Sequence, residues 1–412
     1  MNLTGRAWRM LAVLVGVVSL GSMGRYAVGP LSPFIMEHFG LSKAQFGVLS
    51  SAVGLGAMST AYVAGVLVDR VGVRRMILLG LLAIGAPLAA FLLPLGFPGS
   101  VGLLLLCGAG FSAISPLASN GTVTWFPPES RGLTVGLTQA GIPLGIALSA
   151  LVLPRLALAT SWKVALGALG LSVAGAGVAL HGLYRSGPRA LTSAPPSAGG
   201  DRRRSSLGPF SLIREDSMVW LYALTLSMAI CQNSVISFLV PFLQDRWAVP
   251  VVTAGTLLSV SQFAGMAARP IMGLVSDRAL GGRRKGLLAG LALCASAALA
   301  LLAVSPEGLP GIVIGLLMLI VGMTTLGWPG LVLALSLEKA RPGTGGAASG
   351  LAVAAMMTGA LIGPTLFGFV VDVAAYRTGW LVLSCGLLSV TSLFLLRFRE
   401  RAAGESTAPA EP

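Results

Sequence analysis

The sequence predicts an all-α membrane protein with twelve transmembrane helices in two similar halves. Composition is the first observation behind this prediction. Hydrophobic residues make up 55% of the 412-residue chain and charged residues only 10%, and the mean hydropathy is +0.86. A soluble chain of ordinary composition carries about 25% charged residues, so one apolar anchor on a soluble domain does not explain the deficit. Nearly the whole chain is therefore expected to lie in a bilayer.

The second observation is the length of the apolar stretches. At a rise of ~1.5 Å per residue, about 20 to 28 residues cross the roughly 30 Å hydrocarbon layer with some tilt. The first stretch far exceeds the ~7 to 15 apolar residues of a cleavable signal and is expected to remain as helix 1. Twelve stretches follow one another, at residues 9–37, 44–68, 75–95, 99–125, 131–156, 161–184, 216–244, 250–276, 286–305, 310–337, 346–371 and 377–396.

The positions of the cysteines indicate a structural role and not metal binding. They fall inside predicted spans, and their spacing is not that of metal ligands. We therefore interpret them as apolar packing residues and expect neither a metal site nor a cofactor. The four are Cys107, Cys231, Cys294 and Cys385.

The net charge of +14 follows the membrane topology and does not form one patch. With both termini cytoplasmic, two of the 28 Lys and Arg residues lie within spans, five lie in outer loops and the remaining 21 lie in cytoplasmic segments. This positive-inside bias predicts a multi-pass protein of a cell (inner or plasma) membrane with both termini in the cytoplasm. A nucleic-acid partner is not expected. The five outer residues are Lys43, Arg155, Lys163, Arg246 and Arg377.

One long connection divides the chain. Residues 185–215 contain two adjacent prolines and the run Arg202-Arg203-Arg204 beside serines, a composition typical of a flexible cytoplasmic linker. We predict an N-terminal half at 1–184, a C-terminal half at 216–398 and a cytoplasmic tail at 399–412. A basic linker close to an anionic leaflet can also bind membrane lipids.

A sequence repeat supports this division. The segment GVLVDRVGVRR starts at Gly65, and GLVSDRALGGRRK starts at Gly273, each after the second span of its half. The glycine permits close helix approach, the aspartate can accept hydrogen bonds at a helix N-terminus, and the arginines can reach carboxylates or lipid phosphates. The predicted conformational gating residues are Gly65, Asp69, Arg70, Gly72, Arg74, Arg75, Gly273, Asp277, Arg278, Arg283 and Arg284.

Two such Asp-Arg loops, twelve spans and a basic central linker resemble the major facilitator superfamily over essentially the whole chain. The resemblance implies two pseudo-symmetric six-helix bundles around a central cavity. It also implies a transporter that works by alternating access, and not an enzyme. A glycine and proline pattern from Gly350 to Gly368 resembles one that exchangers of this superfamily carry on helix 5. Tight helix packing with a local bend explains that pattern as well. We expect a monomer.

Two ionisable side chains lie within predicted spans. Each costs at least about 2.5 kcal/mol at the bilayer centre, so both are expected to face a wet cavity or the bundle interior. Arg25 shares a helix face with Tyr26, and Arg269 shares one with Gln262. The place of Arg269 is similar to that of a carboxylate-binding arginine in the oxalate/formate antiporter and monocarboxylate transporter branches. The alternative is that Arg269 pairs with Asp277 or with a carbonyl as part of the gate.

Six further polar residues within spans can be interpreted in two ways. A buried amide, hydroxyl or indole can line the cavity, or it can bond a neighbouring helix for about 0.6 kcal/mol. These candidates for solute binding are Asn120, Gln139, Tyr222, Gln232, Asn233 and Trp328.

Carboxylates are informative by their positions. All fourteen Asp and Glu residues fall at predicted helix ends, in loops or in the tail, which disfavours binding of a cation by a buried acid. We therefore predict a secondary transporter of a small organic anion, a mono- or dicarboxylate, with proton or counter-anion coupling. A boundary carboxylate such as Glu37 would have to carry the proton. The alternative is an exporter of amphipathic drugs or a neutral solute, in which the arginines serve structure.

Overall fold

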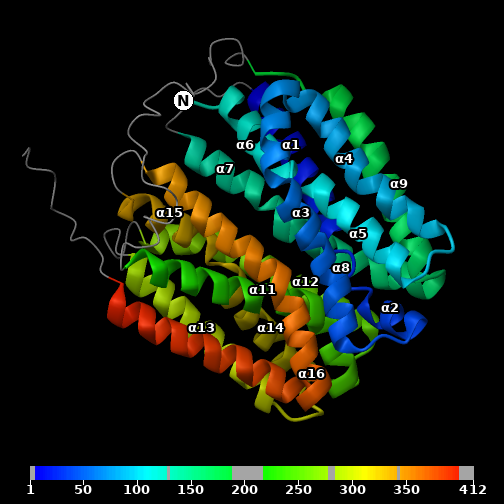
Figure 1. Ribbon diagram of the computed structural model, residues 1–412, viewed down its shortest axis with the longest axis vertical. Coiled ribbons are helices and arrows are strands. Elements are labelled where there is room, and N and C mark those ends of the chain that lie inside the picture. Colours follow the sequence, from blue (N-terminus) through cyan, green and yellow to red (C-terminus); the bar gives the residue numbers. More distant parts are fainter. Residues whose placement is uncertain (1–4, 128–129, 188–216, 277–283, 341–343, 399–412) are drawn as a thin grey trace, which may run out of the picture.

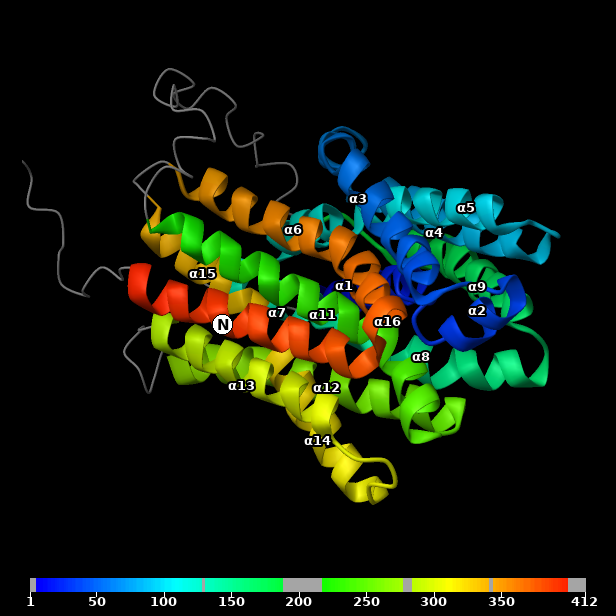
Figure 2. The same cartoon turned by 60° about the horizontal axis from the view of Figure 1, so that its bottom comes forward.

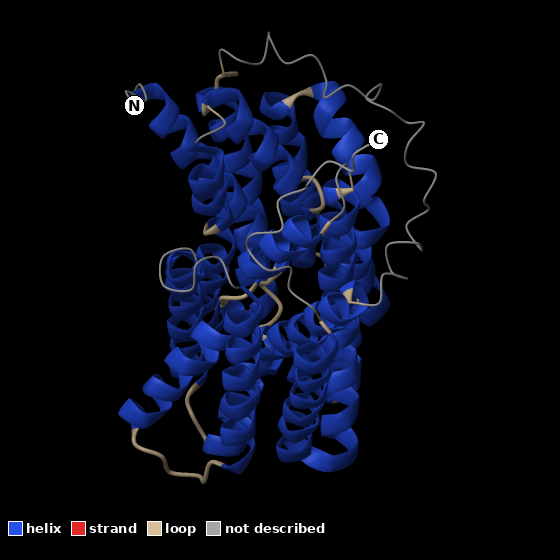
Figure 3. Ribbon diagram, turned by 90° about the vertical axis from the view of Figure 1, so that its left-hand side faces the viewer, coloured by secondary structure: helices blue, strands red, loops and turns tan. Residues whose placement is uncertain are grey.

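The computed structural model describes residues 5–127, 130–187, 217–276, 284–340 and 344–398. Every regular element within these ranges is helical (Figure 3). The helices of the first half are α1 (Gly5–Arg25), α2 (Ser32–Phe39), α3 (Lys43–Val71), α4 (Val73–Ala89), η1 (Ala90–Leu92), α5 (Phe97–Phe111), α6 (Ile114–Trp125), α7 (Arg131–Gln139), α8 (Gly141–Ala159) and α9 (Trp162–Leu183). Those of the second half are α11 (Met218–Trp247), α12 (Val251–Leu274), α13 (Arg284–Val304), α14 (Gly311–Leu326), α15 (Pro329–Lys339) and α16 (Gly345–Arg397).

The predicted twelve spans are confirmed. The described residues contain 11 helical segments that are long and apolar enough to cross a membrane, and the last of them, α16, comprises two spans. Its backbone leaves the helical conformation at Ala374 and Ala375, where the chain reverses direction between its orange and red parts (Figure 2). The sequence placed a boundary between spans 346–371 and 377–396 at this point.

Four spans are broken into two helices each. Proline and glycine account for the breaks, because proline has no N–H to offer the carbonyl four residues earlier. Pro143 leaves the carbonyl of Gln139 without a helical partner in this way. The fourth span of each half is broken, which agrees with the predicted pseudo-symmetry. The broken spans are those predicted at 9–37, 99–125, 131–156 and 310–337.

The two halves form separate helix bundles that lie side by side, the first in blue to green and the second in green to red (Figure 1). Their main contacts pair α3 with α16 and α8 with α12. We call the face where α1 begins and α9 ends the terminal side, and the opposite face the far side.

The far side is closed by close contact between the halves. A Cβ atom on Gly47 of α3 would lie 2.5 Å from the carbonyl oxygen of Pro364 in α16, so only glycine allows this approach. The Ser51 hydroxyl lies 2.9 Å from the Thr365 hydroxyl in the same contact. Gly54 continues it toward the membrane centre.

The faces of α3 and α16 that touch on the far side move apart toward the terminal side. Residues three and four positions apart share one face of a helix, so the α3 face that carries Gly47 and Gly54 continues through Tyr62 to Gly65. Tyr62 is 84% exposed. Neither Gly65 nor Gly350, near the terminal-side ends of α3 and α16, has a neighbouring atom within 4 Å of an added Cβ. Between α3 and α16, the space between the halves therefore opens to the terminal side.

One carboxylate holds the first turn of α3 from the other half of the protein. Asp372 of α16 accepts hydrogen bonds from the backbone N–H of Lys43 at 2.8 Å and of Ala44 at 2.7 Å. The next N–H, of Gln45, bonds to the Ser42 hydroxyl at 3.2 Å. Two of the orphan donors at this helix end, those of Lys43 and Ala44, therefore reach their acceptor only with both halves in contact. Beside them, the ammonium of Lys43 pairs with Asp245 at 2.5 Å.

We predict that Asp372→Asn opens the far side. The substitution removes the charge and one acceptor, so the closed state should lose about 1 kcal/mol after allowance for the exposure of this carboxylate. The ratio of closed to open molecules should fall about fivefold. Electron–electron distance measurements between spin labels at Thr160→Cys and Ser305→Cys, in an otherwise cysteine-free chain, would detect a longer far-side distance.

Glu307→Gln is the matched control, because it breaks the 2.7 Å ion pair with Arg246 on the same side but within one half. It should leave the distance distribution unchanged. An unchanged distribution for Asp372→Asn would show that the cap does not hold the far side closed.

Candidate functional site

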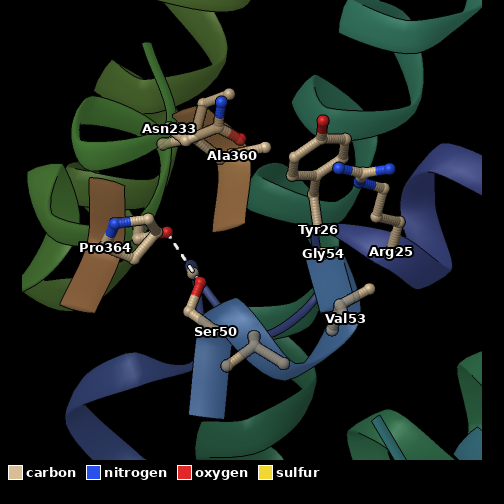
Figure 4. A pocket seen from close by; sticks show the side chains of 12 residues that line it. Arg25, Tyr26, Ser50, Val53, Gly54, Asn233, Ala360 and Pro364 are labelled. Carbon is tan, nitrogen blue, oxygen red and sulfur yellow. Dashed lines mark hydrogen bonds between the residues drawn. The ribbon is translucent and has the colours of Figure 1, made fainter. Parts of the chain in front are cut away.

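A pocket lies between the two halves, with an empty volume of about 370 Å³ that includes open solvent. The residues come from α1, the irregular segment 26–31, α3, α11 and α16, so both halves contribute (Figure 4). They are Arg25, Tyr26, Val28, Gly29, Ser50, Val53, Gly54, Asn233, Ile236, Ser237, Ala360 and Pro364. Three of the sequence-predicted binding residues, Arg25, Tyr26 and Asn233, are brought together here.

Arg25 is the charged residue of this pocket. It is only 6% exposed, and its guanidinium carbon lies 5.1 Å from the centre of the Tyr26 ring and 4.6 Å from that of Phe111. No hydrogen bond or ion pair joins the Arg25 side chain to another described residue. As the last residue of α1, it lies where the helix dipole favours a cation. Ring faces and a dipole stabilise the charge only in part, which leaves the guanidinium donors available to an anion.

Hydroxyl and amide groups complete the wall. Asn233 donates from Nδ2 to the carbonyl of Ala229 at 2.8 Å. The hydroxyls of Ser50 and Ser237 lie 2.8 Å apart across the two halves (dashed line in Figure 4). Sequence reasoning missed both serines, because an isolated serine in an apolar helix usually bonds to its own helix backbone.

Arg269 has a different setting. Its Nε donates to the carbonyl of Leu326 at 3.2 Å and its Nη1 to the carbonyl of Gln139 at 3.3 Å. Leu326 is the last residue of α14, and the Gln139 carbonyl is the one that Pro143 leaves without a helical partner. Arg269 therefore caps a helix break in each half and joins the halves near the terminal side of α12. It does not line the pocket.

The other polar candidates make contacts outside the pocket. Asn120 donates to Asp69 at 2.8 Å, Gln139 donates to Ser115 at 3.1 Å, and the Tyr222 hydroxyl donates to the carbonyl of Ala348 at 3.1 Å. These contacts match the helix-bonding alternative of the sequence analysis.

Three further candidates also lie away from the pocket wall. The Trp328 indole donates to the carbonyl of Thr325 at 2.9 Å, a carbonyl whose helical donor position is taken by Pro329. The Nε2 atom of Gln262 and the Oε1 atom of Gln232 are buried without a hydrogen-bond partner among the described residues.

The first Asp-Arg loop is held by a glycine turn and by contacts between Arg74 and His181. Gly72 has φ of 85°, a conformation that other residues adopt only with strain, and it alone connects α3 to α4. The Nε of Arg74 donates to the carbonyl of His181 at 3.2 Å, and the His181 ring contacts the Arg74 carbonyl at 2.9 Å. Arg70 and Arg75 are exposed.

The second loop is described only at its ends. Gly273 lies in α12, and Arg284, at the start of α13, forms an ion pair with Glu338. Asp277, Arg278 and Arg283 lie outside the described residues. The predicted linker is described only at residues 185–187, and the tail lies outside the described residues.

The chain is similar in sequence and in fold to known membrane transporters. The model of the Major Facilitator Superfamily matches residues 14–364. An uncharacterized MFS-type transporter of Mycobacterium tuberculosis is 29% identical over 98% of this chain and 87% of its own length. The hexuronate transporter of Bacillus subtilis is 30% identical over 37% of this chain and 35% of its own length. The solved structure of a D-xylose-proton symporter covers 95% of this chain and 97% of its own with a TM-score of 0.76 and 18% identity, which shows a shared fold.

We predict that Arg269→Met destabilises the protein. It leaves two carbonyls without donors, and each unpaired group costs about 1 to 3 kcal/mol where it is buried. The thermal unfolding midpoint in detergent, without ligand, should fall by several degrees. The side chain of Arg269→Lys can satisfy one carbonyl, so its unfolding midpoint should lie between those of wild type and Arg269→Met. Arg377→Met, at an exposed far-side position, is the control. A midpoint for Arg269→Met equal to that of wild type would reject the capping role.

Proposed function

The chain belongs to the major facilitator superfamily, and from that premise we propose that this multi-pass membrane transporter carries a small organic anion, a mono- or dicarboxylate, by alternating access. The residues proposed to hold the anion are Arg25 and Tyr26 from the first half and Asn233 from the second. Arg269, first expected to bind the carboxylate, is proposed instead to join the halves through backbone carbonyls.

The setting of Arg25 is the observation that carries this proposal. A buried guanidinium with no carboxylate partner among the described residues is costly, and an anionic solute would relieve that cost with bidentate hydrogen bonds. The pocket lies beside a broken helix, between α1 and α2, and substrate sites of transporters commonly form at such breaks. A hexuronate, named for the relative from Bacillus subtilis, is an anion of this class.

Alternating access is supported by the unequal contacts at the two ends of the interface. The far side is closed and the terminal side is open, which corresponds to one end point of a rocking motion between the halves. With the termini in the cytoplasm, as the positive-inside bias predicts, this conformation faces inward. The first Asp-Arg loop lies at the open end, where it would contact the other half in the opposite state.

Coupling is proposed to use a counter-anion. No carboxylate or histidine is among the residues that line the pocket, so the wall itself supplies no group that titrates near neutral pH. Exchange of one anion for another needs only the guanidinium. Proton coupling would require that the solute carry the proton.

We predict that Arg25→Gln weakens carboxylate binding at least about 30-fold. The variant keeps hydrogen-bond donors but loses the charge, and a desolvated charged contact contributes about 2 kcal/mol or more. Arg25→Lys should bind carboxylates with an affinity between those of wild type and Arg25→Gln, since it keeps the charge without the forked geometry of the guanidinium. Uptake of labelled carboxylates into proteoliposomes, beside a panel of amphipathic dyes and neutral sugars, would measure the effect.

Lys163→Gln removes one positive charge outside the pocket and should transport like wild type. Carboxylate uptake that survives Arg25→Gln would contradict the proposed site. Transport of dyes or sugars without transport of any carboxylate would instead favour the alternative of a drug or neutral-solute carrier.

A further inference from the structure

We propose that the solute is a hydroxylated monocarboxylate, with hydroxyl groups near a single carboxylate, and that Asn233 and Tyr26 recognise those hydroxyls. The inference rests on the proposed function and narrows it. It separates small organic anions by their number of charges and by the hydrogen-bond donors that they carry.

The number of charges in the wall favours a monoanion. Arg25 is the only residue of the pocket lining that is charged at neutral pH. A second carboxylate on the solute would enter the pocket without a cationic partner among the lining residues, and the desolvation of an unpaired charge is costly. A dicarboxylate therefore fits this pocket less well than a monocarboxylate.

Asn233 supplies an acceptor that needs a donor from the solute. Its Nδ2 donates to the carbonyl of Ala229, which fixes the orientation of the amide because only an N–H can donate to a carbonyl. The amide oxygen then points toward the side of the pocket where Tyr26 and Arg25 lie (Figure 4). Asn233 is 7% exposed. A solute without a donor would leave this oxygen without a hydrogen bond, which destabilises the complex.

The pocket that contains the Asn233 oxygen also contains protein hydroxyl groups that can form hydrogen bonds with a solute hydroxyl. The Tyr26 phenol makes no hydrogen bond with another described residue, and it can both donate and accept. The Ser50 and Ser237 hydroxyls bond to each other across the halves, and that bond must break when the far side opens. Both serines could then bond to the solute in the other conformation.

A hydroxyl fits better than an ammonium group, the other common donor beside a carboxylate. The lining residues include no carboxylate, and an ammonium group would lie near the Arg25 guanidinium. Like charges at short range in a poorly solvated site repel strongly. The pocket chemistry therefore favours a hydroxy acid over an amino acid.

Matched acids test this inference on the purified full chain. Propionate, lactate and alanine share one skeleton and differ in one substituent, and cyclohexanecarboxylate and quinate form a larger pair. Dissociation constants from thermal-shift titrations should be about tenfold or more lower for lactate and quinate than for their unsubstituted partners. Alanine and the dianion malonate should bind no better than propionate.

Asn233→Leu identifies the residue responsible. The variant keeps the side-chain volume and removes the acceptor, so the preference for lactate and quinate should fall to within about twofold. The loss of preference should come from weaker binding of lactate and quinate. Gln232→Leu, the neighbouring amide outside the pocket lining, should keep the wild-type preference.

The outcomes separate the two proposals. Equal affinities within each pair, or tighter binding of alanine or malonate than of lactate, would overturn the hydroxyl inference and leave organic-anion transport in place. The same holds if Asn233→Leu keeps the full preference. If no carboxylate shifts the midpoint, or if neutral inositol binds as tightly as quinate, the proposed function itself is overturned.

Discussion

In a bilayer, every backbone N–H and C=O group has to find its partner inside the protein. Continuous helices satisfy this constraint along most of each span. Where a helix stops within the membrane, a side chain has to take over, as Arg269 does for the carbonyls of Leu326 and Gln139 and Trp328 does for Thr325. The breaks can therefore form only where such side chains, or a wet cavity, are at hand.

That constraint assigns different work to the two arginines within the spans. Arg269 lies between two broken helices, and carbonyl oxygens accept hydrogen bonds from its Nε and Nη1 atoms. Arg25 ends α1 next to the irregular segment 26–31, with the rings of Tyr26 and Phe111 close to its guanidinium. The same residue type therefore supports the helix framework at one position, and at the other it is the residue proposed to bind the solute.

Span number and the two halves could be predicted from sequence because hydropathy and loop charge depend on local composition. The predicted boundary inside α16 coincides with the two residues, Ala374 and Ala375, at which the backbone leaves the helical conformation. The contacts of single polar residues could not be predicted. Asn120 bonds to Asp69, 51 positions away, and Ser50 meets Ser237 in the other half. Such pairs depend on how helices rotate about their axes, which periodicity does not specify.

Among the candidate binding residues, the cost of burying a charge selected both Arg25 and Arg269. The structure places Arg25 and its neighbour Tyr26 in the pocket lining and Arg269 outside it. The preference for Arg269 came from a family resemblance in the position of the residue, and the structure gives that position a backbone partner in each half. A resemblance in position does not specify which groups surround a side chain.

The cap that Asp372 places on α3 has a consequence for how the protein changes state. Because the acceptor belongs to the other half, the first turn of α3 is complete only while the halves touch on the far side. When they part, water must replace the carboxylate at the amides of Lys43 and Ala44. Hydrogen exchange at these two amides should therefore follow far-side opening directly and report the transport cycle without any attached probe.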